Sequence, residues 1–299
     1  MKKMQHIPVL LGEVLEVLKP KAGNRFADFT AGYGGHSTKL LKAVGKHGFG
    51  YLFDQDPAAI QHLAQQLKDH QNVVIKQANF GDLDWVNDLP TVDIMLVDLG
   101  VSSPQLDTPR RGFSFRQDGP LDMRMDTQQS LTAAEIVNTY RERELADLIY
   151  CYGEERRSRQ IAKAVVEART EAPIETTLQL ADIVHAVMPK GKIDSATRTF
   201  QALRIAVNDE IGALESFLQN FPAKLAPGGR IAIVSFHSLE DRLVKQTFKI
   251  LSTPTQDQFG QVASKPQFKL VTKKPIVVNE YDLNPRARSG KLRAVEKIN

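Results

Sequence analysis

Short apolar runs alternate with amphipathic segments over the first hundred residues of the chain. Apolar runs bounded by polar or turn residues predict buried strands, and such runs lie at 24–29, 49–53, 73–76 and 92–97. Between them, apolar residues at spacings of three and four predict helices at 36–44 and 57–68. An amphipathic helix is also predicted at 9–18, where Pro20 closes the segment. This alternation predicts a parallel, doubly wound, Rossmann-like α/β sheet.

The alternation then gives way to a different pattern. Residues 106–126 contain Pro and Gly and have no period, which predicts a long loop. Helices are predicted at 131–140, 142–150, 158–170 and 177–187, and one long helix at 200–218. The sheet resumes at 230–236 after a turn at 227–229, with a last pair of strands at 269–272 and 292–295. We therefore expect one domain from residues 1–105 and 205–299, with an all-helical domain inserted at 106–204.

Composition narrows the class of protein only a little. The 299 residues carry a net charge of +4, and no apolar run approaches the roughly 18 residues of a membrane span. Cys151 is the one cysteine, so an internal disulfide is excluded and a cytoplasmic location is expected. Basic residues gather near the end of the chain, among them Lys273, Lys274, Arg286 and Arg288. That segment suits phosphate contact, although an ordinary solvated face explains it equally well.

Acidic residues follow three of the predicted strands. Asp28 ends the first strand and opens the glycine-rich segment 28–36, Asp54 follows the second, and Asp98 follows the fourth. Asn79 and Phe80 follow the third strand, where an aromatic ring can cover an adenine. In doubly wound sheets the ligand binds beyond the carboxyl ends of the strands, so these residues mark the candidate site.

Two ligands compete for this arrangement. A dinucleotide fingerprint is only partly met, because Gly32, Gly34 and Asp54 fit it while Ser37 occupies the third glycine position. The acid at Asp28 would oppose a pyrophosphate, which favours positive potential. S-adenosylmethionine carries a cationic sulfonium and amino group, and Asp28 and Asp98 favour it. Tight-turn glycines without a ligand are the third possibility. No metal site is predicted.

If the ligand is a methyl donor, the acceptor chemistry is restricted. Methylation at C5 of a pyrimidine needs a thiolate, and we expect Cys151 to be a core residue of an apolar helix. The segment Ser103-Pro104 after Asp98 resembles the motif with which amino-methylating enzymes hold a base amine, although Gln105 replaces a proline. Asp98, Ser102 and Ser103 are therefore candidates to accept the amine hydrogens, unless the serines serve only a turn.

Two further segments are candidates for substrate contact. The loop at 110–116 mixes arginines with aromatic rings, in particular Arg111, Phe113 and Phe115. That mixture suits an unpaired base and its phosphates, while a hydrophobic clasp between domains is the competing interpretation. His237 follows the strand at 230–236, at the expected ligand edge, although a lone histidine is more often structural.

Longer motifs make the sequence resemble one family, the bacterial 16S ribosomal RNA N4-cytosine methyltransferases. The resemblance runs through nearly the whole chain and rests on these segments: GGHS at 34–37, DLGVSSPQLD at 98–107, RGFSF at 111–115, DGPLDMRMD at 118–126, YGEER at 152–156, ATRTFQA at 196–202, SFHSLEDR at 235–242 and NPRARS at 284–289. The loop before GGHS departs from the family, where relatives often have Gly-Arg-Gly.

The resemblance implies a class I methyltransferase sheet with an inserted helical substrate domain. It implies methylation of the N4 amine of a cytidine in the decoding region of 16S ribosomal RNA, within the small ribosomal subunit. Carried over by position, the S-adenosylmethionine site would comprise Gly34, Gly35, His36, Asp54, Phe80, Asp98 and Gln105. From the residue types described above, we expect Asp98 and Ser103 to be catalytic. We expect contact with the RNA from Arg111, Phe113, Phe115, His237, Arg286 and Arg288.

Two other classes stay open at this point. One is a nicotinamide-dependent oxidoreductase, which the glycine loop and Asp54 permit. The other is a ribosome-assembly factor that keeps the cofactor fold and binds RNA without catalysis. The acid at Asp98 and the Ser-Pro segment after it argue against the second class.

Overall fold

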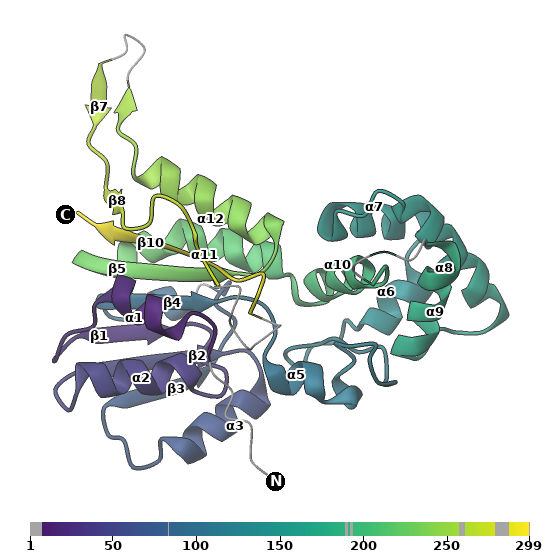
Figure 1. The fold of residues 1–299 in the computed structure, drawn as a ribbon. Coiled ribbons are helices and arrows are strands. Elements are labelled where there is room, and N and C mark those ends of the chain that lie inside the picture. The colour runs from purple at the N-terminus through teal and green to yellow at the C-terminus, as the bar shows by residue number, and fades with distance from the viewer. Residues whose placement is uncertain are drawn as a thin grey trace. The chain divides into compact units, whose positions relative to one another are not determined.

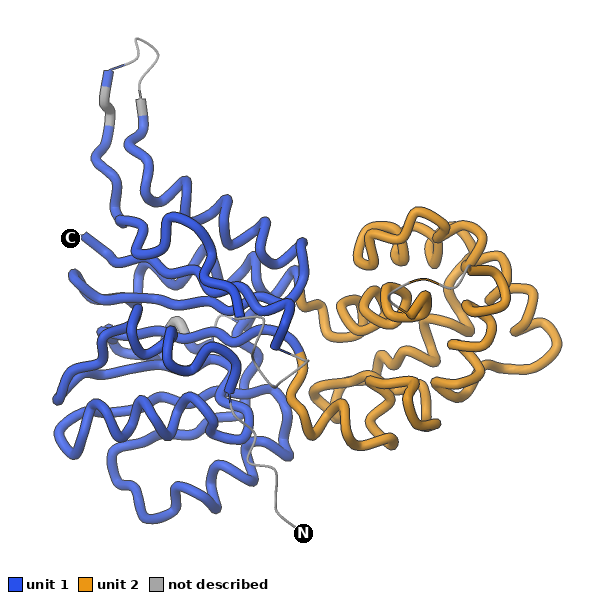
Figure 2. The backbone as a smooth tube through the Cα atoms, viewed as in Figure 1, with its two compact units in different colours: residues 1–100, 211–299 blue, residues 101–210 orange. Residues whose placement is uncertain are grey.

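The chain divides into two compact units. A computed structural model describes residues 8–82, 84–188, 191, 194–256, 261–278 and 287–298. Residues 1–100 and 211–299 form the first unit, and residues 101–210 form the second (Figure 2). The division lies five or six residues outside the predicted domain limits of 105 and 205. We call the two parts the sheet unit and the helical unit and describe each by itself.

The sheet unit is built on a twisted, mostly parallel sheet (Figure 1). Its strands are β1 (Arg25–Asp28), β2 (Phe49–Asp54), β3 (Val73–Gln77), β4 (Val92–Asp98), β5 (Leu225–Ser235), β8 (Phe268–Leu270), β9 (Ile276–Val277) and β10 (Lys291–Lys297). They follow the order β3-β2-β1-β4-β5-β10-β8, and β9 also pairs with β10. β1 to β5 are parallel to one another, whereas β10 is antiparallel to β5 and to β8. Strand order therefore reverses between β1 and β4, as the doubly wound prediction requires.

Helices cover both faces of this sheet because alternate strand residues point to opposite faces. Phe26, Leu52 and Ile94 belong to one buried cluster, together with α1 (Leu11–Leu18), α2 (Gly35–Val44) and α3 (Pro57–Gln66). Ala27 and Met95, their neighbours in the strands, belong to the other, with α4 (Asp84–Asp88), α11 (Glu210–Lys224) and α12 (Ser238–Leu251). The strands are continuous apolar runs in the sequence because both of their faces are buried. Within the described residues, no helix combines the length and apolar character that a membrane span requires.

The predicted turn at 227–229 lies inside β5. Val92 pairs with Leu225 and Ile94 with Arg230, so the register shifts by several residues opposite Asp93. Gly228 has a φ of 75°, which glycine adopts without strain. The chain therefore turns at the predicted place without leaving the sheet. A small hairpin of β6 (Thr255–Gln256) and β7 (Val262–Ser264) follows α12.

The helical unit packs around its own apolar core. Its elements are α5 (Ser103–Asp107), the 3-10 turn η1 (Pro109–Arg111), α6 (Ala133–Thr139), α7 (Glu142–Gly153), α8 (Ser158–Glu171), α9 (Thr177–Val187) and α10 (Thr197–Asn208). The core is formed by residues such as Ile136, Leu145, Ile161 and Leu180, each fully buried. The helices predicted between residues 131 and 187 are therefore confirmed.

Two predictions about helices are wrong. The long helix at 200–218 is two helices, α10 and α11, because Asp209 takes a left-handed conformation with a φ of 45° and ends the first. Cys151 is exposed on α7. The buried face of that helix runs through Leu145 and Ile149, and a residue two positions after Ile149 points away from it. The helices α4, α5 and α12 were not predicted.

The segment without period, 106–126, is held in place by buried polar bonds. Asn208, which is 4% exposed, accepts the backbone N–H of Met125 at 2.7 Å and donates to the carbonyls of Met123 and Arg204 at 2.8 and 2.9 Å. Arg124 binds Asp122 through two hydrogen bonds of 2.8 Å. These bonds replace the regular pairing of a helix or strand.

Replacing Asn208 by Ala should therefore destabilise the protein. The change leaves the buried N–H of Met125 and carbonyl of Met123 without partners, and each such group costs about 1–3 kcal/mol. We expect a loss of about 2–4 kcal/mol in urea unfolding. Asn220→Ala is the control, because Asn220 makes one bond within its own helix, to the carbonyl of Ser216. Equal stability losses in the two variants would contradict the structural role of Asn208.

Candidate methyl-donor site

Three carboxylates meet at one edge of the sheet. Asp28 ends β1, Asp54 ends β2 and Asp98 ends β4. Asp28 is in register with Leu52 on one side and Leu96 on the other, each two residues before the acid of its own strand. The sequence predicted this gathering from the strand ends alone.

Asp28 is a structural carboxylate at the base of the glycine-rich segment. It is 1% exposed, and its Oδ2 accepts the hydroxyl of Ser37 at 2.5 Å while Oδ1 accepts the N–H of Thr30 at 3.2 Å. Burial raises its pKa to about 6, with a smaller contribution from the charge of Asp54. Asp28 therefore fixes the first turn of the segment and places a negative potential beneath it.

Asp54 is oriented by the backbone around it. Its Oδ2 accepts the N–H of Gly32 at 2.7 Å, and its Oδ1 accepts the N–H of Asp56 at 2.8 Å. Burial raises its pKa to about 6 despite these bonds. The backbone N–H of Gln55 also donates to this carboxylate. A carboxylate offers about four acceptor positions, so Asp54 keeps one for a further hydroxyl. This geometry suits a ribose hydroxyl of a nucleoside ligand.

Asp98 differs because one of its oxygens has no protein partner. Its side chain is 23% exposed and its Oδ2 lies 3.5 Å from Nδ1 of His36, whereas Oδ1 is buried without a hydrogen bond. Burial raises the pKa of Asp98 well above its usual range, and the charges of Asp28 and Glu240 raise it further. A neighbouring cation would relieve this repulsion.

In His36, beside Asp98, the nitrogen that carries the hydrogen can be assigned. Nε2 of His36 lies 3.1 Å from the carbonyl of Val9, and a carbonyl only accepts, so Nε2 carries a hydrogen. Nδ1 then faces Oδ2 of Asp98, and a protonated ring would form an ion pair with this carboxylate. Thr30 fixes the strand end from the other side, because its hydroxyl accepts the N–H of Asp98 at 2.6 Å.

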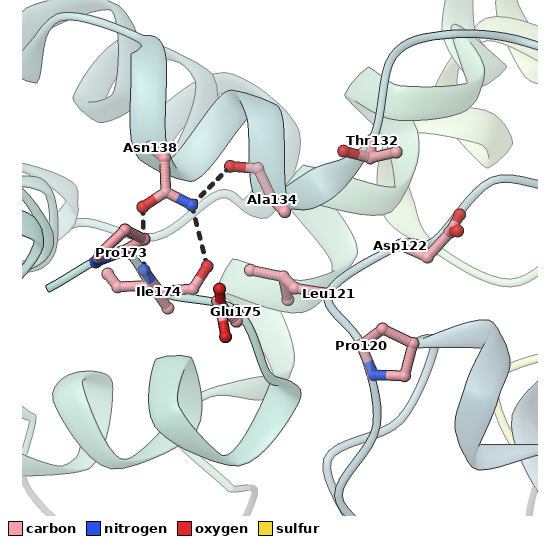
Figure 3. A pocket seen from close by; sticks show the side chains of 9 residues that line it. All are labelled: Pro120, Leu121, Asp122, Thr132, Ala134, Asn138, Pro173, Ile174 and Glu175. Carbon is pink, nitrogen blue, oxygen red and sulfur yellow. Dashed lines mark hydrogen bonds between the residues drawn. The ribbon is translucent and has the colours of Figure 1, made fainter.

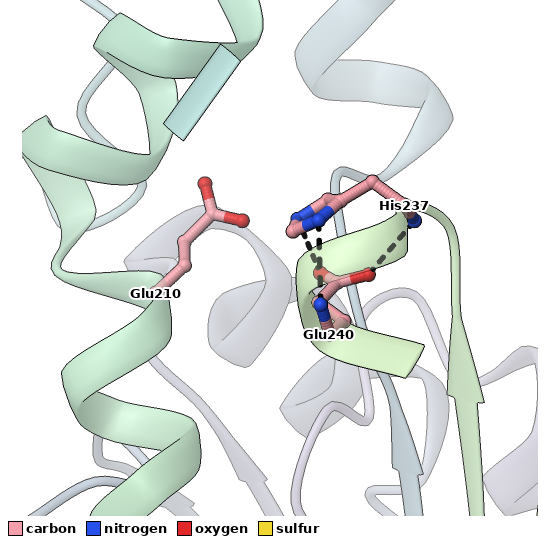
Figure 4. A group of neighbouring side chains, drawn as sticks. All are labelled: Glu210, His237 and Glu240. Carbon is pink, nitrogen blue, oxygen red and sulfur yellow. Dashed lines mark hydrogen bonds and ion pairs between the residues drawn. The ribbon is translucent and has the colours of Figure 1, made fainter. Parts of the chain in front are cut away.

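His237 and Glu240 form a second polar group at the start of α12, after β5 (Figure 4). Glu240 is 2% exposed and its Oε2 accepts the N–H groups of Phe236 and His237 at 2.7 and 3.2 Å. The N–H of Glu240 donates to Nδ1 of His237 at 3.4 Å, so the hydrogen of the neutral ring lies on Nε2. Nε2 lies 3.1 Å from Oε1 of Glu240 without hydrogen-bond geometry. Glu210, drawn in the same figure, is held by Arg204 through bonds of 2.7 and 2.8 Å.

The sequence did not single out Glu240 or Thr30. Glu240 follows His237 by three residues, the spacing of a capping box, which was the available signal. Thr30 lies two residues after Asp28, where a hydroxyl commonly binds a strand-end carboxylate or amide.

The glycines of the first loop permit close packing. Gly34 has a φ of 82°, and a Cβ there would lie 2.8 Å from Oε1 of Gln66. A Cβ on Gly35 would lie 2.6 Å from Cγ of Pro8. A Cβ on Gly32 would meet only the carbonyl of Thr30, at 3.8 Å, so the backbone at Gly32 is open to a ligand.

Other predicted site residues have structural partners as well. Phe80 is 8% exposed and packs edge-on against Phe217 at 5.9 Å. Ser102 caps α5 in a reciprocal box with Gln105, and Gln105 is 5% exposed. Ser103 opens that helix, five residues after Asp98 along the chain.

Several residues predicted to contact RNA also have partners within the protein. Arg111 donates to the carbonyls of Arg124 and Met125 at 3.0 Å. Phe113 is 8% exposed in the core of the helical unit, and Phe115 packs edge-on against Phe200 at 4.7 Å. All of these contacts lie within the helical unit, whereas the alternative interpretation was a clasp between domains.

The basic end of the chain is partly used within the sheet unit. Lys269 binds Glu296, Arg293 binds Asp241, and Lys297 donates to two carbonyls. Arg288 is exposed. Arg286 lies outside the described residues.

The helical unit also has a shallow hollow between α6 and the segment before α9 (Figure 3). Asn138 spans it, donating to the carbonyls of Ala134 and Ile174 and accepting the N–H of Ile174. Its amide is thus occupied by the backbone. Glu175 and Asp122 also line the hollow, and carboxylates disfavour a phosphate there. The hollow is not a candidate site for nucleic acid.

The sheet edge fits S-adenosylmethionine better than a dinucleotide. The buried Oδ1 of Asp98 lacks a partner, three acids with raised pKa values surround the edge, and the backbone at Gly32 is open. When bound, this molecule supplies an electrophilic methyl group on a cationic sulfonium. Asp54 would hold its ribose, and Asp98 would attract its positive charge. The arrangement defines a class I, S-adenosylmethionine-dependent methyltransferase.

Comparison with known proteins agrees with this class. The MraW methylase family profile matches residues 3–298, and the chain belongs to this family. A protein of Geotalea daltonii named ribosomal RNA small subunit methyltransferase H is 45% identical over 312 residues, covering all of both chains. A protein of the same name from Carboxydothermus hydrogenoformans is 46% identical, covering 99% of each. Membership of a methylase family argues against both alternatives, the nicotinamide-dependent oxidoreductase and the non-catalytic ribosome-assembly factor.

Among solved structures, a ribosomal RNA methylase from Streptococcus thermophilus has a TM-score of 0.40 and 14% identity, covering 97% of this chain and 94% of its own. An S-adenosylmethionine-dependent O-methyltransferase from Thermotoga maritima has a TM-score of 0.45 and 11% identity, covering 100% and 69%.

Replacing Asp98 by Asn should stabilise the ligand-free protein at high pH. The folded pKa of Asp98 is raised, so its stabilising contribution is present at low pH and is lost as the pH rises through that pKa. Asn does not ionise. We expect Asp98→Asn to be more stable than the wild type at pH 8 in urea unfolding, with little difference at pH 4. The stability difference between Asp98→Asn and the wild type should thus be larger at pH 8 than at pH 4. A smaller difference at pH 8 would contradict the raised pKa of Asp98.

Replacing Asp54 by Ala should weaken S-adenosylmethionine binding by about 1.5–3 kcal/mol at pH 8, the scale of hydrogen bonds to a charged group. The pKa of Asp54 is about 6, so wild-type affinity should fall as the pH drops below 6 and the difference should shrink. Titration calorimetry at pH 5 and pH 8 measures both effects. The exposed Asp69→Ala variant is the control. Unchanged affinity in Asp54→Ala at pH 8 would remove the ribose role.

Proposed function

We propose that this enzyme methylates the N4 exocyclic amine of a cytidine in the decoding region of 16S ribosomal RNA. The observation that carries the proposal is the 45% identity along the full chain with a small-subunit ribosomal RNA methyltransferase. The substrate would be the RNA of the small ribosomal subunit, and the reaction would take place in the cytoplasm, where subunits are assembled.

Two buried atoms at the strand ends suit a cytosine base. Oδ1 of Asp98 is an acceptor without a partner, and Nε2 of His237 is a donor without a hydrogen bond. Cytosine offers an amine hydrogen beside an acceptor nitrogen on its pairing edge, the complement of such a pair. Uracil offers the reverse order. The base has to be unpaired or turned out of its stack, because pairing otherwise engages N4.

Asp98 has two tasks in this proposal. An exocyclic amine is a weak nucleophile because its lone pair is delocalised into the ring, and an acceptor for its hydrogen directs that lone pair toward the methyl carbon. The nitrogen gains a methyl group and gives up one proton. A carboxylate with a raised pKa is a suitable acceptor for this proton, and Nδ1 of His36 lies 3.5 Å from its Oδ2. Ser103 is the other candidate for the amine hydrogens, through its position just after Asp98.

The remaining predicted contacts complete the proposal. Gly34, Gly35 and His36 in the first loop, with Phe80 and Gln105, would line the methyl-donor site. Phe115, Arg286 and Arg288 would face the RNA. Arg111 and Phe113, whose side chains have partners within the helical unit, would hold the 110–116 loop in place.

The test is a map of modified nucleosides. Small-subunit RNA from cells that lack the protein should lose one N4-methylated cytidine of the decoding region, as mass spectrometry detects. Purified wild-type protein with S-adenosylmethionine should restore it, whereas Asp98→Asn should restore it about 10²–10³-fold more slowly in single turnover. Complete modification in the deleted cells would refute the proposed substrate.

A further inference from the structure

The arginines of the helical unit are mostly occupied. Seven of them bind a carboxylate or a backbone carbonyl through the guanidinium group: Arg111, Arg124, Arg141, Arg143, Arg169, Arg198 and Arg204. Outside the 110–116 loop, the exceptions are Arg156, Arg157 and Arg159. Their side chains are exposed and make no hydrogen bond or ion pair within the described part of the chain.

These three arginines lie on a rigid corner between α7 and α8. Glu155, which is 5% exposed, accepts the N–H of Arg157 at 2.9 Å and the guanidinium of Arg198 on α10 at 3.3 Å. A Cβ on Gly153 would lie 2.6 Å from the carbonyl of Arg198, so the end of α7 is pressed against the start of α10. Gln201 donates to the carbonyl of Tyr152 at 2.9 Å. The corner therefore presents its arginines from a fixed backbone.

The arginines do not stabilise the fold where they stand. Arg157 precedes the first residue of α8 and Arg159 is its second, so both lie at the positive end of the helix dipole. The first turn of α8 contains no acidic residue, and Glu155 is buried and already bound. Like charges so close together repel one another. A surface of this kind is favoured when a polyanion covers it.

We propose that Arg156, Arg157 and Arg159, with Arg198 beside them, form a surface that contacts phosphates of the RNA substrate, an inference that rests on the proposed function. A guanidinium group binds phosphate oxygens through paired hydrogen bonds, and these exposed arginines offer several such groups to the phosphates of one strand. The contact is to the backbone and is independent of sequence.

The salt dependence of RNA binding tests this surface. Each lost phosphate contact lowers the slope of log affinity against log salt by about 0.7–0.9. Arg156→Gln/Arg159→Gln in the full chain should therefore lower the slope by about 1.4–1.8 and weaken binding about 20- to 60-fold at 0.1 M salt. The probe is a transcript of the 16S decoding region, measured by fluorescence anisotropy.

The matched control is Arg141→Gln/Arg143→Gln, which removes the same charge from exposed positions of the same unit. Arg141 and Arg143 have their own partners, Glu144 and Asp147, so the slope should stay at the wild-type value. The melting temperature and the calorimetric affinity for S-adenosylmethionine should match the wild type in both variants, which separates lost RNA contact from misfolding.

Equal slopes for the two double variants would overturn the proposed surface, and would leave this corner to another class of partner. A wild type that binds the transcript but fails to methylate small-subunit RNA would instead overturn the proposed function. The two failures are distinguishable because the slope needs no methyl transfer.

Discussion

Like charge held out of water at one sheet edge is the constraint on which the rest of the sheet unit depends. Asp28, Asp54 and Asp98 end neighbouring strands, and desolvation raises the pKa of each. Such groups persist because the surrounding backbone and hydroxyls hold them, through Ser37 and Thr30 at Asp28 and through Gly32 and Asp56 at Asp54. The protein keeps an unfavourable potential in the free state, and a cationic methyl donor converts it into binding energy.

Much of this arrangement follows from the sequence, for identifiable physical reasons. Strands buried on both faces are continuous apolar runs, so the four strands of the first hundred residues and their terminal acids could be predicted. The break at Asp209 could not, because apolar spacing continues across it and a single left-handed residue leaves no periodic signal. The exposure of Cys151 depends on which face of α7 packs against its neighbours, and a shift of one residue in the helical pattern changes that face.

The candidate site divides similarly. Acids at strand ends can be recognised from the sequence, but the environment of a side chain depends on the folded structure. Phe113 and Arg111 combine the residue types of an RNA-binding loop, yet one ring is packed in the core and the guanidinium holds two carbonyls. Glu240 was overlooked for the converse reason, since nothing in its sequence context says that it is buried beside a strand end.

The left-handed residues at the two ends of the helical unit have a consequence for how such a protein can diverge. Gly100 has a φ of 89° just before this unit begins, and Asp209 has a φ of 45° just before it ends. A residue of this kind breaks the propagation of regular structure, so neither the register of β4 nor the phase of α11 is transmitted from the helices between them. The helical unit can therefore change its length or its surface while the strand ends that carry the acids stay fixed.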